Sequence, residues 1–174
     1  MKAHLKRSNS AAGFSLIELF IVISIIGAIA TVAIPGYVGV VNATKRAETD
    51  GMFHGIQKAV LDYLAQNNDR FPTDLGGGAS SITGMWNPAV IDGAKKPWAT
   101  GQAGWNLLAW EPLSWVYHSY YLYGYTDPTT TTLTIRAATD LNRNGVIAYR
   151  VQEWQRFGTG WTLVNDYIDP AGEW

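Results

Sequence analysis

The sequence predicts an α+β protein in which one long N-terminal helix packs on a roughly four-stranded antiparallel sheet. Three observations lead to this prediction. Residues 14–41 form an almost continuous apolar run, residues 42–65 repeat apolar positions at spacings of three and four, and residues 116–164 contain four stretches of alternating character. The remaining parts are a basic segment at 1–13 and a segment rich in Gly and Pro at 66–115. Residues 116–174 therefore hold the sheet and a C-terminal loop.

The apolar run contains a single charged residue, Glu18, between Phe14 and Val41. A helix needs about 20 apolar residues, at ~1.5 Å each, to cross a hydrocarbon core, so this run is long enough to span a membrane. A carboxylate in such a helix costs roughly 2.5–3.5 kcal/mol on insertion scales and is expected to have a partner. The run has no Lys, Arg or His. Cleavage after Gly13 would create a positively charged partner for Glu18, because the new α-amino group of Phe14 would lie one helical turn away.

The first thirteen residues are basic and lack an apolar core of their own. Lys2, Lys6 and Arg7 favour a cytoplasmic N-terminus, which places the globular part outside the cytoplasmic membrane. An ordinary secretory signal has its apolar segment before the cleavage site, whereas here it follows Gly13 and would be retained. A plain uncut single-pass anchor is the alternative, but it leaves Gly13-Phe14 and Glu18 unexplained.

A short basic leader is followed by Gly13, Phe14, the sequence Leu16-Ile17-Glu18-Leu19, a long apolar helix and Pro35. This order resembles the prepilins of type IV pili and the pseudopilins of type II secretion. The detailed likeness covers roughly residues 2–63. It implies a type IV pilin-like fold and a structural role in a filament.

The resemblance also implies the chemistry at the N-terminus. A prepilin peptidase would cut after Gly13 and N-methylate Phe14, and Glu18 would neutralise the N-terminus of an adjacent subunit during assembly. The implied partners are further copies in a helical filament, the peptidase, the pilus assembly machinery and other pilins. The implied location is the bacterial inner membrane, then an extracellular pilus or a periplasmic pseudopilus. Motility (twitching), adhesion or secretion would be the role of the fibre.

The apolar helix has four weak positions, Gly27, Pro35, Gly36 and Gly39. Proline in a helix interior removes one backbone hydrogen bond and costs about 3 kcal/mol. We expect either a kink near Pro35 or local unwinding between Gly27 and Gly36. The resemblance implies that this segment loses helicity inside a filament, whereas a static bend is the alternative.

The helix is expected to continue to about Ala65 and to stop within residues 66–69. One side of its second half is apolar and should face a core: Met52, Ile56, Ala59, Val60, Tyr63 and Leu64. Residues 66–115 are predicted to be an irregular, surface-exposed connection. Four tryptophans are expected to hold it by packing and subunit contact, with sugar binding or electron relay as alternatives: Trp86, Trp98, Trp105 and Trp110. Strands are predicted at 115–125, 131–138, 146–152 and 161–164.

Residues 140–145 match the first half of a calcium-binding loop. The predicted ligands are three side chains and one backbone carbonyl: Asp140, Asn142, Asn144 and Val146. The twelfth position is Val151 rather than Glu, so a complete site needs an acid from elsewhere, Glu153 or Asp166. The alternative is a hairpin loop in which Asn144-Gly145 supplies a positive φ.

Composition excludes several other functions. The formal charge is −1, with no basic stripe of the kind that binds nucleic acid, and there is no cysteine. The three histidines, His4, His54 and His118, share no metal-binding or catalytic spacing. We therefore expect no enzyme but a structural subunit: a major pilin, a minor pilin or a pseudopilin. A membrane-tethered calcium- or sugar-binding module that never polymerises is a more distant alternative.

Overall fold

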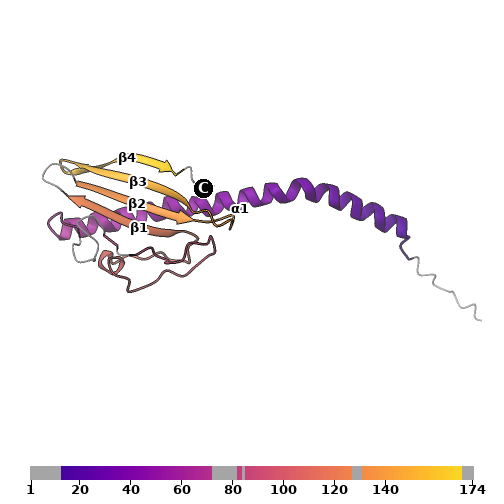
Figure 1. The fold of residues 1–174 in the computed structure, drawn as a ribbon, viewed down its shortest axis with the longest axis horizontal. Helices are drawn as coiled ribbons and strands as arrows, with labels where there is room; N and C mark the ends of the chain where they lie inside the picture. Colours follow the sequence, from indigo (N-terminus) through magenta and orange to yellow (C-terminus); the bar gives the residue numbers. More distant parts are fainter. Residues whose placement is uncertain (1–12, 72–81, 84, 127–130, 170–174) are drawn as a thin grey trace, which may run out of the picture. The chain divides into compact units, whose positions relative to one another are not determined.

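The computed structural model describes residues 13–71, 82–83, 85–126 and 131–169. The chain divides after Val41 into two compact units. Its elements are a long helix, a short 3-10 helix and four strands (Figure 1): α1 (Leu16–Gln66), η1 (Trp105–Leu108), β1 (Ser119–Thr126), β2 (Thr131–Thr139), β3 (Ala148–Phe157) and β4 (Gly160–Ile168).

The α+β prediction is confirmed, because a long apolar N-terminal helix accompanies a four-stranded antiparallel sheet of order β1-β2-β3-β4. This arrangement is consistent with a type IV pilin-like fold. The predicted strand ends were wrong in three places. The third strand was expected at 146–152, but β3 continues to Phe157, because its last residues pair with β4. β1 begins at Ser119, opposite Ala138 of β2, because Val116 pairs instead with Lys96 in the preceding segment. β4 continues to Ile168, because its last residues pair with β3 as far as Arg150.

The core forms where the second half of α1 packs on one face of the sheet. The predicted apolar side of the helix is buried, except that Tyr63 is only half-buried, and Thr49 and Phe53 join it. Phe53 meets the ring of Tyr120 edge-on at 6.2 Å between centroids. Each fully buried large side chain contributes roughly 1.5–3 kcal/mol, so burial of Phe53, Ile56 and Leu64 holds this half of α1 on the sheet.

Alternation along the strands places the other half of this core. In β1 and the residues before it, one face is buried: Val116, His118, Tyr120 and Leu122. In β2 one face is likewise buried: Leu133, Ile135 and Ala137. The opposite face of the sheet carries aromatic contacts, with Trp86 lying 5.4 Å from Tyr121 and 6.0 Å from Tyr149 between ring centroids.

Backbone hydrogen bonds attach the segment before the sheet to the outer edge of β1. The N–H of Ile82 donates to the carbonyl of Leu122 at 3.1 Å, and Asn87 exchanges bonds of 3.0 and 2.9 Å with Tyr120. The side chain of Asn87 is fully buried, and its amide makes two 3.0 Å bonds to the backbone of Ala99. These bonds satisfy an edge that would otherwise be open to pairing with other chains.

The expected unwinding between Gly27 and Gly36 is absent from the single chain, since α1 is continuous through Pro35. Proline removes one hydrogen bond from the ladder, while the bonds of the turns on either side remain available to the helix. A bend at Pro35, and loss of helicity inside a filament, stay predictions.

Candidate assembly site

The helix begins in a reciprocal pair of hydrogen bonds between Ser15 and Glu18. The Ser15 carbonyl accepts the N–H of Leu19 at 3.2 Å, and Ser15 Oγ accepts the N–H of Glu18 at 3.2 Å. In return, Glu18 Oε2 accepts bonds of 2.9 Å from both the N–H and the Oγ of Ser15. This is a capping box, a serine followed three residues later by glutamate. Sequence reasoning missed it, although Ser15 and its spacing from Glu18 were visible.

The capping box gives Glu18 a local role before any cleavage occurs. An acid in the first turn also interacts favourably with the helix dipole, by about 0.3–1 kcal/mol. The hydrogen bonds within the described residues reach only Oε2 of Glu18, and Oε1 accepts none. Oε1 is therefore available to a second donor, such as an amine.

Gly13 and Phe14 precede the helix and are exposed, Phe14 by 90% of its surface. A Cβ added to Gly13 would meet no atom within 4 Å, and its φ does not lie in the left-handed region. Within the part of the chain that the structure describes, the fold gives no steric or conformational reason for glycine at this position.

The apolar half of α1 is uncovered. Its most apolar 18-residue window has a mean hydropathy of 2.6, and none of that window is buried. Among the described residues, α1 is the one helix that is long enough and apolar enough to cross a membrane. Folded monomers rarely expose continuous apolar patches of more than a few hundred Å², so this surface needs lipid or other helices around it. Gly27, Gly36 and Gly39 have open space where a Cβ would be, which permits close helix approach.

A second polar cluster, absent from the sequence predictions, joins α1 to the residues around the start of β1. The carboxylate of Glu48 accepts the N–H of Tyr117 at 2.9 and 3.1 Å. It also lies 3.2 Å from Nδ1 of buried His118 and 3.3 Å from the hydroxyl of Tyr120. Burial, together with the neighbouring charge of Glu48, raises the pKa of Tyr120 well above its usual value. His118 is thus a buried residue that contacts a carboxylate.

The predicted calcium loop has the hydrogen bonds of a turn. Asp140 Oδ1 and Oδ2 accept the N–H groups of Asn144 and Gly145 at 3.1 and 3.0 Å, and Asn144 Oδ1 accepts that of Val146 at 2.8 Å. Gly145 has a φ of +82°, as the hairpin alternative requires. Asn142 Oδ1 also accepts the N–H of Asn144, at 3.3 Å.

The acids suggested to complete a calcium site are engaged elsewhere. Asp166 pairs with Arg150 at 3.0 Å, and Glu153 accepts a 2.6 Å bond from Asn165. No group of three His, Cys, Asp or Glu able to hold a metal occurs within the part of the chain that the structure describes. Asp140 is thus the one carboxylate of this loop, and both of its oxygens are occupied. Ca²⁺ takes six to eight oxygen ligands, so the calcium site stays a prediction.

Comparison with known proteins gives one informative match. The chain is 35% identical over 81 residues to the fimbrial protein EcpC of Eikenella corrodens, which is 45% of this chain and 52% of that protein. The chain therefore spans about half the length of the curated relative it matches. No family model matches, and no solved structure matches. The chain is similar to a fimbrial protein through part of its length.

Proposed function

We propose that this chain is the structural subunit of a type IV pilus, a prepilin cut after Gly13 and assembled through its N-terminal helix. The proposal depends on one observation, the uncovered apolar half of α1. This helix begins in a capping box in which Oε1 of Glu18 accepts no hydrogen bond from the described residues. The similarity to a fimbrial protein supports a role in a surface fibre. The type IV motif and the processing steps rest on the sequence resemblance.

In the proposed assembly step, helices of neighbouring copies replace lipid around residues 14–41. The α-amino group of Phe14, created by cleavage, would meet a Glu18 carboxylate in a neighbouring copy. In an apolar surrounding an unpaired carboxylate is costly, so subunits would be accepted in the register that pairs each Glu18. The capping box holds Oε2 at the start of the helix, which fixes the direction in which Oε1 is presented.

Two substitutions test the separate steps. Gly13→Ala should fold and insert normally, because a Cβ meets nothing there, but should accumulate as uncut precursor on a gel. Glu18→Ala should be inserted and cut but should fail to enter fibres. Purified surface fibres, with the subunit identified by mass and starting at methylated Phe14, would support the proposal. A mature chain that still begins at Met1, or normal piliation by Glu18→Ala, would overturn it.

Related roles remain alternatives. A minor pilin would occur in few copies per cell, and a type II secretion pseudopilin would be confined to the periplasm. Copy number and localisation of the protein separate these from a major pilin. A tethered, non-polymerising binding module is favoured if no fibre contains the chain. We propose a structural rather than a catalytic role, and no bound cofactor.

We also propose that residues 140–146 are a hairpin loop rather than a calcium site, because the described oxygens accept backbone N–H groups. Titration with CaCl₂ should leave the melting temperature unchanged. A rise in melting temperature that is abolished by Asp140→Asn would restore the calcium interpretation.

A further inference from the structure

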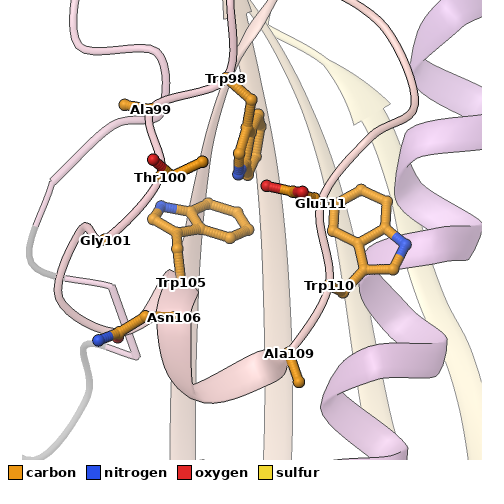
Figure 2. A pocket seen from close by; sticks show the side chains of 9 residues that line it. All are labelled: Trp98, Ala99, Thr100, Gly101, Trp105, Asn106, Ala109, Trp110 and Glu111. Carbon is orange, nitrogen blue, oxygen red and sulfur yellow. The ribbon is translucent and has the colours of Figure 1, made fainter.

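A cavity of about 240 Å³ lies beside η1 and is lined by residues 98–101, 105–106 and 109–111 (Figure 2). Three of its walls are tryptophan rings, Trp98, Trp105 and Trp110. It lies wholly within the unit that begins at Asn42. The cavity is separate from the N-terminal assembly segment, so its function can be tested whether or not the chain polymerises.

The aromatic walls are held in place before any ligand arrives. The ring of Trp98 is nearly perpendicular to those of Trp105 (4.8 Å, 80°) and Trp110 (5.9 Å, 83°). Trp105 is only 2% exposed, and its Nε1 donates to the carbonyl of Met85 at 3.4 Å. Trp110 rests on the backbone of α1, where a Cβ added to Gly55 would lie 2.6 Å from its ring. A preformed site of this kind loses little entropy on binding.

The polar side chains of the cavity differ in whether they point into it. Glu111 is the one ionisable side chain among the nine described residues that line it, and its carboxylate points into the space between the rings (Figure 2). The hydroxyl of Thr100 and the amide of Asn106 point away from that space. The interior therefore combines aromatic faces, which carry a negative quadrupole, with one negative charge.

We propose that this cavity binds an organic ammonium ion, with Trp98 and Trp110 as the aromatic cage, buried Trp105 as the ring that supports Trp98, and Glu111 as the counter-charge. Aromatic faces attract alkylated ammonium groups, and the exposed carboxylate of Glu111 adds a charge of opposite sign beside them. A bare divalent metal ion needs several oxygen ligands, whereas one carboxylate points inward. A sugar needs several converging hydrogen-bonding side chains, whereas Glu111 is the one ionisable side chain of the lining and the polar ends of Thr100 and Asn106 point away.

The volume limits the size of the ligand. Cavities for drug-sized molecules run from about 300 to 1,000 Å³, so 240 Å³ suits a small head group rather than a whole metabolite. Two sources share this chemistry: a free quaternary ammonium compound and the alkylammonium end of a lysine side chain.

The test is a titration of the full chain in micelles of a non-ionic polyoxyethylene detergent, followed by the indole ¹⁵N–H signals in NMR spectra. Tetramethylammonium chloride should shift the signals of Trp98 and Trp110 in a saturable manner, with a dissociation constant on the order of 1 mM. Sodium chloride at equal ionic strength and tert-butanol, a neutral molecule of similar shape, should not. n-Butylammonium represents the lysine source, and the tighter of the two cations identifies which source the cavity prefers.

Glu111→Gln keeps the shape of the side chain and removes its charge, so it should weaken tetramethylammonium binding about fivefold. Glu111 is exposed, so this variant should keep the fold, which its spectrum will show. Trp115→Phe is the matched control, because Trp115 is 58% exposed and lies outside the cavity. Equal shifts with tert-butanol, unchanged binding by Glu111→Gln, or saturation by glucose instead of the cations would each overturn the proposal.

Discussion

The carboxylate of Glu48 on α1 accepts the backbone N–H of Tyr117, at 2.9 and 3.1 Å, two residues before β1 begins. Sixty-nine positions of sequence separate the two residues. Tyr117 precedes the strand pairing, so its N–H has no partner in β2 and would need one from outside the sheet. The bond thus connects the middle of the long helix to the first strand.

Glu48→Ala should lower the free energy of unfolding by about 1–3 kcal/mol, because it leaves the N–H of Tyr117 and Nδ1 of His118 without this acceptor. The measurement is denaturant unfolding of the full chain in detergent micelles. Asp62→Ala on the exposed side of α1 is the control and should change stability little. Equal stability of the two variants would show that the Glu48 cluster adds nothing to the fold.

A matched pair of helix glycines tests the packing of Trp110. Gly51→Ala meets no atom within 4 Å and should stabilise the protein by about 0.5–1 kcal/mol, because alanine is the better helix former. Gly55→Ala would place its Cβ 2.6 Å from the Trp110 ring. This overpacking should lower the free energy of unfolding of the protein by about 1–3 kcal/mol. Thermal unfolding of both variants is the measurement. Stabilisation by both would mean that Trp110 moves freely away from α1.

The Arg150–Asp166 pair should make the free energy of unfolding depend on pH in the acidic range. Hydrogen bonds from Arg150, then from Gln152, hold the pKa of Asp166 below its ordinary value of 3.8. A lowered carboxyl pKa in the folded state adds stability that is fully present above 3.8 and is lost as the pH falls through the folded-state pKa. Asp166→Asn should therefore be less stable than the wild type at pH 7, and the difference should shrink below pH 3.8. Unfolding curves at pH 7, 4 and 2.5 measure it, and a difference independent of pH would contradict the prediction.

Loss of the N-terminal cap should loosen the start of α1. Ser15→Ala removes the hydroxyl that accepts the Glu18 N–H and donates to Glu18 Oε2, at a typical cost near 1 kcal/mol. Amide exchange at residues 16–19 in micelles should then be about fivefold faster. Ser24→Ala is the control, because Ser24 bonds only to the Phe20 carbonyl inside the helix. Unchanged exchange in Ser15→Ala would show that the capping box does not order the terminus.

Local patterns predicted most of the fold. The spacing of Ile56, Val60 and Leu64 identified the buried side of α1, and alternation at Leu133 and Ile135 identified the inner face of β2. Both patterns depend only on helix and strand geometry, which the sequence displays directly. Strand ends were less predictable, because Val116 could pair with β2 or with Lys96, and tertiary contacts decide between them.

The site was predicted only in part. The apolar run and Glu18 were evident, whereas the link between Ser15 and Glu18 was overlooked despite its local signature. The bond between Asn87 and Ala99 and the tryptophan cavity could not be predicted, because they depend on how an irregular segment folds back on itself. Such contacts produce no repeating pattern of apolar residues in the sequence.

The attachment of residues 82–116 to β1 has a consequence for biogenesis. Main-chain bonds from Ile82 and Asn87 attach the segment to β1, and the sequence contains no cysteine. Maturation of this domain therefore needs no thiol oxidase or disulfide isomerase, and reductants in the surroundings have no covalent bond to break in it.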